Sequence, residues 1–286
     1  MKILVGTLYT IENEFEQCLA GIRQQTYTNF ENFVLKNLPN KEAHERLYQT
    51  FMEGADEFDL FMKVDADMVI ENKHLFARIV DKFNMTAWLK DLIIAVHDFF
   101  SDQLIWGMHT YRNTVRWSRN EEHLFVDDYP GKHDEVILDD SELAPAAVHC
   151  KDPSPFQSFH YGVHRGLKVI QPGRAELHVQ ASRDHWENLQ KTWLNFLRTN
   201  DRRIAFATLG AELVFKGGIQ PHHLDYTNPY LVNLFRRYER LSSAQLKQKI
   251  KRISLAGFAF LPSELRRRVL LAVSKSKTRG TLLFDS

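Results

Sequence analysis

The sequence predicts an α/β protein in which a Rossmann-like β-α-β-α-β unit, with a mixed central sheet flanked by helices, precedes a helical C-terminal extension. Short apolar runs alternate with amphipathic helical patterns from the N-terminus to Asp65. Two consecutive apolar runs follow in the middle of the chain, and helical periodicity dominates the second half. Alternating strands and helices favour parallel strands, right-handed crossovers and ligand sites at the carboxyl ends of the strands.

The β-α-β-α-β unit is predicted from five segments. Short runs rich in β-branched or aromatic residues predict strands. Apolar residues at helical spacing predict amphipathic helices, and acidic residues at the start of the first one suit the helix dipole. The expected strands are 2–8, 30–35 and 58–64, and the expected helices are 12–24 and 41–53.

The remaining elements depart from strict alternation. Apolar runs at 92–100 and 103–111 predict an antiparallel hairpin. A helix is expected at 156–165, with Ser154 as its cap, Pro155 at its first position and Gly166 near its end. Further expected elements are a helix at 74–85, a short strand at 135–138 and helices at 186–199, 204–215, 229–253 and 262–274. We expect two domains, 1–185 with the sheet and the site, and 186–286, which is helical and basic.

Composition excludes several classes of protein. The chain has 286 residues, of which 44% are hydrophobic and 26% are charged, so it has ample apolar material for a core. Two cysteines, Cys18 and Cys150, are too few for a disulfide framework or a cysteine-built zinc site and indicate a reducing compartment. No apolar run approaches the roughly 20 residues that cross a bilayer. We therefore expect a cytoplasmic protein.

The net charge of +1 hides an uneven distribution. Residues 230–286 hold 13 Lys and Arg against 3 Asp and Glu, which leaves 24 basic and 33 acidic residues in 1–229. The basic clusters at Arg236-Arg237, 247–252 and Arg266–Arg268 are interleaved with apolar residues. Such helices can lie on an anionic membrane, bind nucleic acid or form a solvated face. Peripheral contact with the inner face of a membrane is one expectation.

Two carboxylates end the third expected strand. The segment 58–70, FDLFMKVDADMVI, carries Asp65-Ala66-Asp67 directly after its apolar part. Carboxylates one residue apart at a strand end can both approach one divalent cation, and hard cations such as Mg²⁺ or Mn²⁺ prefer oxygen ligands that they share with phosphates. Solvated loop acids would give the same short pattern, so the position after the third strand is what favours a metal site.

The segment from Met1 to Ile70 resembles the nucleotide-sugar-binding half of family-2 glycosyltransferases of the GT-A fold. The resemblance rests on several weak motifs in order: Thr7, Tyr9, Glu12 and Glu14, then Gln25-Thr26-Tyr27, Asn29-Phe30-Glu31 and Asp65-Ala66-Asp67. It covers about a quarter of the chain. It implies a GT-A fold and a metal-dependent glycosyltransferase that moves a sugar from a nucleotide-diphosphate donor to a glycan or lipid-linked acceptor, with inversion expected.

The resemblance also implies residue roles. Thr7, Tyr9 and Glu14 would line the base and ribose pocket, although turn packing explains Thr7 and Tyr9 equally well. Asp65 would lie near the ribose or the metal, and Asp67 would bind Mn²⁺ or Mg²⁺ bridging the diphosphate. The family often has an acidic pair after the second strand, whereas this chain has Lys36-Asn37; Asn37 can still hydrogen-bond a base.

An inverting enzyme needs a group that takes the proton of the acceptor hydroxyl. In the family this base is an acid shortly before a helix that follows the acceptor-side strands. Segment 147–165 occupies that place, so Asp152 is the preferred base, and a helix-cap or turn acid is the alternative. His149 is a second candidate, and the adjacent acids Asp139 and Asp140 are weaker ones.

Histidines and aromatic residues complete the predicted site. Many GT-A enzymes take a further metal ligand from a later His, and His178 and His185 lie in that region, although each alone fits a surface or packing role. A zinc hydrolase is disfavoured because no His-Glu-x-x-His pair occurs. The segment 103–117, with Trp106 and Trp117, suits an acceptor face or a half-buried hairpin.

Two rival functions remain at this level. A nucleotidyltransferase on a similar sheet would want a Gly-rich, basic phosphate loop after the first strand, and residues 6–14 offer only Gly6 and no basic residue. A non-catalytic nucleic-acid-binding protein would use the basic tail, yet the body is acidic and Asp65 and Asp67 would be unexplained. We therefore expect no nucleic-acid partner.

Overall fold

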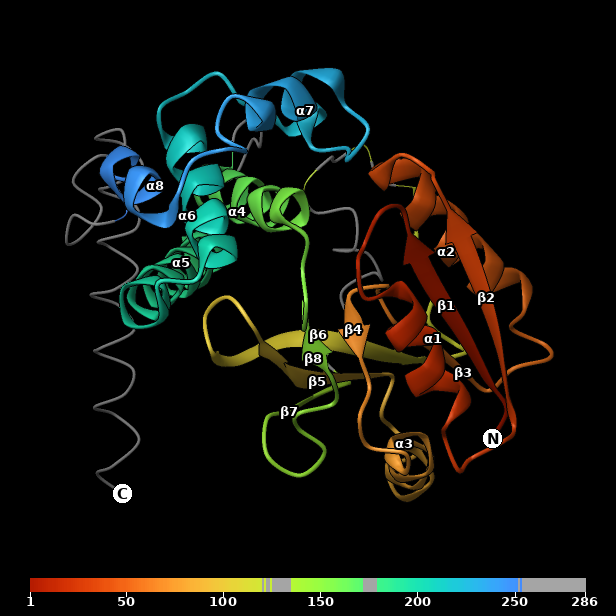
Figure 1. Ribbon diagram of the computed structural model, residues 1–286. Coiled ribbons are helices and arrows are strands. Elements are labelled where there is room, and N and C mark those ends of the chain that lie inside the picture. Colours follow the sequence, from red (N-terminus) through yellow and green to blue (C-terminus); the bar gives the residue numbers. More distant parts are fainter. Residues whose placement is uncertain (120, 122–123, 125–134, 172–178, 252, 254–286) are drawn as a thin grey trace, which may run out of the picture. The chain divides into compact units, whose positions relative to one another are not determined.

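A computed structural model describes residues 1–119, 121, 124, 135–171, 179–251 and 253 (Figure 1). The chain forms two compact units, which we call unit 1, Met1–Gln157, and unit 2, Ser158–Ser286. The sequence placed a division of roles between residues 185 and 186. That division stays a prediction, and the helices at 158–185 belong to the compact unit that follows Gln157.

Unit 1 is a mixed α/β structure with an open sheet flanked by helices. The sheet has eight strands in the order β2-β1-β3-β6-β5-β8-β4, with β7 pairing β5. The first three are parallel, whereas β6 is antiparallel to both β3 and β5. The strands are β1 Ile3–Tyr9, β2 Phe30–Lys36, β3 Leu60–Lys63, β4 Met68–Val69, β5 Asp91–Asp98, β6 Gln103–Arg112, β7 Val136–Asp139 and β8 Val148–His149.

The first strands have apolar residues on both faces because helices cover both. Ile3 and Val5 of β1 join the core cluster that contains α1 and α3, while Leu4 between them joins the cluster that contains α2. Successive side chains of a strand point to opposite faces, so a continuous apolar run is what a sheet buried on both sides requires. The helices are α1 Phe15–Arg23, α2 Asn40–Glu53 and α3 Leu75–Met85.

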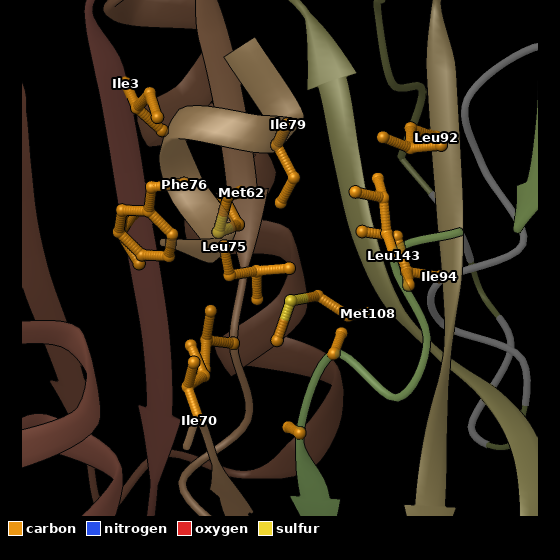
Figure 2. Packing of buried hydrophobic residues seen from close by; sticks show 14 of the residues in the cluster. Ile3, Met62, Ile70, Leu75, Phe76, Ile79, Leu92, Ile94, Met108 and Leu143 are labelled. Carbon is orange, nitrogen blue, oxygen red and sulfur yellow. The ribbon is translucent and has the colours of Figure 1, made fainter. Parts of the chain in front are cut away.

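The larger core cluster fixes the end of β3, where Asp65 and Asp67 follow. Figure 2 shows Leu75, Phe76 and Ile79 of α3 packed beside Met62 of β3 and Met108 of β6, and all five are fully buried. Each such side chain stabilises the fold by roughly 1.5–3 kcal/mol through burial. The strand that leads into the two acids is therefore rigidly held.

Unit 2 is helical and is built around α6, Arg202–Phe215. Ten of the 14 residues of α6 are buried, so it is apolar nearly all round. Its aromatic residues pack on neighbouring helices: Phe206 lies against Phe235, and Phe215 against Trp186. The other helices are α4 Pro155–Ile170, which begins in unit 1, α5 Val179–Thr199, the short 3₁₀ helix Pro221–His223, α7 Pro229–Arg236 and α8 Ser243–Lys249.

The sequence predicts most of these elements. The β-α-β-α-β order, the antiparallel hairpin of β5 and β6, and Ser154 as the cap of α4 are confirmed. The expectation that α4 ends near Gly166 is wrong, because α4 runs to Ile170. Gly166 is needed for packing instead, since a Cβ there would lie 3.0 Å from Ala211 Cα of α6.

The expected single helix at 229–253 is also wrong. The structure has two helices, α7 and α8, because Ser242 starts the second with a capping box in which its hydroxyl accepts from Gln245 N. The expected helix at 262–274 and the cluster Arg266–Arg268 lie outside the described residues. Within the described residues, no helix is both long and apolar enough to span a bilayer.

Candidate functional site

A carboxylate, an imidazole and a thiol meet beside the end of β3. Oδ2 of Asp67 lies 3.4 Å from Nε2 of His149 and 3.3 Å from Sγ of Cys150, and Sγ lies 3.5 Å from Nε2. We call these three residues the Asp67 group. In the described part of the chain they form a set of side chains that could hold a metal ion.

Backbone pairing brings the Asp67 group together although its members come from distant parts of the chain. The two-residue strands β4 and β8 pair antiparallel, so that Met68 faces His149. The N–H of Cys150 then donates to the carbonyl of Asp67 at 2.8 Å. Cys150 has φ of 52°, a left-handed conformation that a residue with a Cβ rarely adopts and that often marks a functional site.

Asp98 orients the imidazole. Its Oδ1 lies 2.8 Å from Nδ1 of His149, and its Oδ2 accepts from both the N–H and the hydroxyl of Ser101 at 2.8 and 2.6 Å. Asp98 is completely buried at the end of β5. The second nitrogen, Nε2, is thereby directed toward Asp67, which is how a carboxylate commonly fixes a metal-binding histidine.

One atom of the group lacks a partner. Oδ1 of Asp67 is buried, and among the described residues no hydrogen-bond donor reaches it. Leaving a buried carboxylate oxygen unsatisfied costs roughly 1–3 kcal/mol or more. The Asp67 side chain is 16% exposed as a whole and that of His149 is 12% exposed, so the group remains in reach of solvent. A cation bound by the Asp67 carboxylate would offset the cost of burying this oxygen.

The electrostatics reflect crowding of groups of both signs. Burial would lower the pKa of His149, but the negative charges of Cys150 in its thiolate form and of Asp67 raise it well above its usual range. Burial also raises the pKa of Asp67, yet the neighbouring imidazolium outweighs it and lowers that pKa. Burial, followed by Asp67, raises the pKa of the Cys150 thiol well above its usual range.

Further acids surround the Asp67 group. Burial raises the pKa of Glu12 to about 7. Backbone N–H donors lower this pKa, and the negative charge of Asp67 raises it further. Burial and then the charges of Asp67, Asp65 and Glu12 raise the pKa of the Cys18 thiol to about 12. Asp65 is balanced by the buried Lys63, whose Nζ lies 2.7 Å from Oδ2.

The same side chains could be compared with a Cys–His–Asp nucleophilic triad. Such a triad needs a thiol whose pKa is lowered and which substrate can reach. Cys150 is only 1% exposed, and its pKa is shifted in the opposite direction because the thiol is buried and, in addition, lies against the Asp67 carboxylate. The arrangement favours ligation of a cation over nucleophilic attack by the thiol.

Glu14 and Gln157 brace the loop that carries Asp152. Glu14 is fully buried, and its two oxygens accept from the N–H of Asp152 and from Nε2 of Gln157, both at 2.8 Å. Oε1 of Gln157 accepts from the N–H of Asn13 at 3.1 Å. The side chain of Asn13 in turn donates to the carbonyl of Asp152 at 2.8 Å. Both backbone polar groups of Asp152 are thus held, while the residue is exposed.

Other candidates for the catalytic base are used differently. Oδ1 of Asp139 accepts from the N–H groups of Ser141 and Leu143, so this buried acid holds a turn. Asp140 is exposed at the same turn. His149 lies between Asp67 and Asp98, which is a position that suits a metal ligand, and its role as a base stays a prediction.

The predicted donor-pocket residues lie at the ends of β1 and β2. Thr7 is buried, and its hydroxyl accepts from Nδ2 of Asn32 at 3.2 Å. Tyr9 stacks on Phe15 with ring centroids 3.9 Å apart. Asn37 is exposed, and its N–H donates to the carbonyl of Tyr9 at 2.9 Å. Thr7 and Glu14 therefore have packing and bracing roles, and contact with a donor stays a prediction for all five predicted residues, Asp65 included.

A metal-ligand role is predicted for two later histidines, His178 and His185. His178 lies outside the described residues. His185 lies in α5 of unit 2, where its Nδ1 is 3.0 Å from Nη1 of Arg165. Sequence reasoning missed Asp98, Cys150 and Gln157, because each acts through a contact with a segment distant in the chain. The only local signal was the position of Asp98 at the end of an expected strand.

Comparisons with known proteins do not assign this site. No family model and no curated protein matches the chain. Among solved structures, the crystal structure of A197 from STIV is similar at 17% sequence identity with a TM-score of 0.27, over 34% of this chain and 47% of that one. The match spans about half the length of that chain, and a likeness of this degree carries no functional argument. The fold and site therefore define a mixed α/β protein with a candidate metal-binding group.

Proposed function

We propose that this protein is a metal-dependent glycosyltransferase of the GT-A type. It would transfer a sugar from a nucleotide-diphosphate donor to a glycan or lipid-linked acceptor, with inversion. The observation that carries the proposal is the unpartnered, buried Oδ1 of Asp67, just beyond the end of a parallel strand and within a group that could hold a cation.

The topology of unit 1 supports the proposal. β2, β1 and β3 are parallel, and in open sheets of this kind ligands bind beyond the carboxyl ends of the strands. Tyr9, Asn37 and Asp65 all follow or end these strands. The antiparallel β6 then separates the three parallel strands from β5, which leads into Asp98. The sequence resemblance and the sheet topology therefore both favour a ligand site at the edge where the parallel strands have their carboxyl ends.

The cation would be held by Asp67 with His149 and Cys150, and it would neutralise charge that develops on the departing diphosphate. The chain's own contribution is to hold these ligands in place through β4, β8 and Asp98. The negative potential of Glu12 and Asp67 attracts the cation before any donor binds.

The base would be Asp152. Its backbone is fixed by Glu14 and Asn13, so its carboxylate is presented from a rigid loop rather than from a mobile one. An exposed carboxylate can accept the proton of an incoming hydroxyl group as that oxygen attacks the anomeric carbon.

Lys36 lies over the rings of Phe15 and Tyr9, with its Nζ 4.9 and 5.8 Å from the ring centroids. Its positive charge could attract a phosphate of the donor.

A donor screen tests the function. Each common nucleotide sugar would be incubated with the protein and Mn²⁺, Mg²⁺ or Zn²⁺, and slow release of free sugar would be measured. We expect one donor to be hydrolysed only with metal, and Asp67→Ala to abolish the reaction. Asp56→Ala, which changes an exposed acid in unit 1, serves as the matched control. Failure of every donor, or hydrolysis that survives Asp67→Ala, would refute the proposal.

Attachment to a membrane is proposed for the basic tail. α7 and α8 carry part of its charge, and the rest lies outside the described residues. Co-sedimentation of the full chain with vesicles containing anionic lipid tests it, with uncharged vesicles as control. Binding that needs anionic lipid and weakens with salt supports attachment, and equal recovery with both vesicles excludes it.

A further inference from the structure

We propose that the Asp67 group is a three-ligand site for a borderline transition-metal ion such as Zn²⁺, with Cys150 binding as a thiolate. The inference deepens the proposed function by assigning the class of metal, and to that extent rests on it. Metal binding itself is measured without a donor. The site thereby differs from an all-oxygen Mg²⁺ site of the kind that the two aspartates alone suggest.

The distances match a tetrahedral ion. Zinc binds sulfur at about 2.3 Å, nitrogen at about 2.0–2.1 Å and oxygen at about 2.0–2.2 Å, which gives ligand-to-ligand separations of about 3.4–3.6 Å. The three separations in the Asp67 group are 3.3, 3.4 and 3.5 Å. Three different ligand atoms therefore form one nearly regular triangular face of the expected size.

The ligand types define the metal class. Thiolate ligands select zinc and other softer ions, imidazole suits zinc, copper and iron, and Mg²⁺ prefers oxygen in an octahedral arrangement. One carboxylate, one imidazole and one thiolate cannot supply such an oxygen shell. They supply the mixed oxygen, nitrogen and sulfur ligands that zinc accepts.

The backbone positions the sulfur for this role. The left-handed conformation of Cys150 is held by its hydrogen bond to the carbonyl of Asp67, and the preceding residue is held by β8. A buried cysteine that only filled space would not need this conformation. Cys18 offers the contrast, since it lies in the regular helix α1 and its sulfur contacts the carbonyl of Asp65 at 3.6 Å.

The residues that would position the imidazole ligand are also in place. Asp98 binds Nδ1 of His149 and is itself fixed by Ser101, so the imidazole presents Nε2 to the metal. Three protein ligands with one remaining position are the pattern of catalytic zinc sites, whereas structural sites use four. That fourth position would take water or a phosphate oxygen of the donor.

Binding is balanced by release of protons. The divalent ion forms bonds to Oδ2 of Asp67, Nε2 of His149 and Sγ of Cys150, and protons held on the sulfur and on Nε2 pass to solvent. No electron is transferred. Without the ion, the same atoms share these protons in hydrogen bonds, which is the competing interpretation of the close contacts.

Cobalt substitution tests the sulfur ligand directly. Co²⁺ would be titrated into the metal-free full chain, and a thiolate-to-cobalt charge-transfer absorption would be followed. We expect one equivalent to produce the band, and one equivalent of Zn²⁺ to remove it while a large excess of Mg²⁺ does not. Cys150→Ser should lose the band and Cys18→Ala, the only other cysteine variant, should keep it.

Two further measurements keep the test independent of folding. X-ray absorption of the zinc-loaded parent protein should show one sulfur in the first shell. Asp98→Asn should weaken Zn²⁺ binding roughly 10- to 100-fold while the cobalt band remains, since outer-shell partners act through their ligand.

The outcomes separate this inference from the proposed function. A parent protein that binds no Zn²⁺, or binds it without sulfur in the first shell, overturns the three-ligand site. Mg²⁺-dependent donor hydrolysis without a cobalt band would overturn it while leaving the glycosyltransferase intact. A cobalt band in a protein that hydrolyses no donor supports the site and refutes the function.

Discussion

Several buried polar side chains of unit 2 bond within their own helix or to a neighbouring helix, whereas three titratable side chains of unit 1 meet at one place beyond the strand ends. Thr192 and Thr208 donate to carbonyls four residues earlier, and Tyr161 donates to Asn188 of α5. In unit 1, Asp98, His149 and Asp67 form a chain that ends on an oxygen without a partner.

This difference between the two units distinguishes polar groups that stabilise the fold from polar groups that can bind a ligand. Local hydrogen bonds satisfy polar groups at small net gain and need no ligand. Convergent titratable groups with shifted pKa values and one unmet acceptor are costly unless a ligand completes them, and such groups are the expected mark of a site. We therefore expect substitutions in the site of unit 1 to change binding and catalysis, and substitutions in the helix core of unit 2 to change stability alone.

Outside the metal ligands, the largest effect is expected from Asp152→Asn. Loss of a general base reduces kcat by about 10²- to 10⁴-fold. Donor affinity should not change, because the variant keeps the backbone bonds to Glu14 and Asn13. Transfer rates and donor binding would be measured separately, with Asp56→Asn as control. A variant with normal kcat would remove Asp152 from the mechanism.

Gly162→Ala should be the most damaging change in unit 2. A Cβ at Gly162 would lie 1.6 Å from the carbonyl oxygen of Ala207, so α4 and α6 would have to separate. Overpacking of this kind costs about 1–3 kcal/mol or more of unfolding free energy. Denaturant unfolding measures it, and Lys191→Ala on the exposed side of α5 should stay within about 0.5 kcal/mol of the parent. Equal stability of both variants would contradict the close helix packing.

Asp201→Ala should cost about 0.5–2 kcal/mol at neutral pH, because Asp201 caps α6 by accepting from Arg203 N. Burial opposes its ionisation, but the side-chain bond from Arg203 outweighs it and lowers its pKa below 3.8. Its stabilising effect is thus present above the unfolded pKa and is lost as pH falls through the lower folded one. Unfolding of parent and variant at pH 7 and pH 3 tests this, and a difference that grows in acid would contradict it.

A change in the pH dependence of stability is expected from Glu12→Gln. Burial raises the pKa of Glu12 from 4.5 to about 7, so the folded state holds this proton more tightly than the unfolded state. Stability should therefore fall as pH rises from 4.5 towards 7, and the variant should lose less stability over that range. Gln can still accept from the N–H groups of Thr10 and Ile11 as Glu12 does. If the unfolding free energies of parent and variant change in parallel with pH, the pKa of Glu12 is not raised in the folded state.

Sequence reasoning predicted the α/β class and most of the elements of unit 1, and it named Asp67 and His149 of the candidate metal-binding group. The strands could be predicted because each is a short apolar run, and Asp67 because it follows one. Cys150, Asp98 and Gln157 could not, since β4 and β8 are too short to give a periodic signal and their pairing joins segments that are far apart in the chain. Gly166 led to a wrong prediction of the end of α4, because the sequence does not distinguish a glycine that permits close helix packing from one that ends a helix.

The central claim is that Asp67 holds a divalent ion that in turn binds a nucleoside diphosphate. Calorimetric titration of nucleoside diphosphates into the full chain, with Zn²⁺ or Mn²⁺ and then with chelator, tests it most directly. We predict that at least one binds only with metal, and that Asp67→Ala weakens it by about 100-fold or more, since a ligand should matter at least as much as an outer-shell partner. Binding that is equally tight with chelator or in Asp67→Ala would contradict the account.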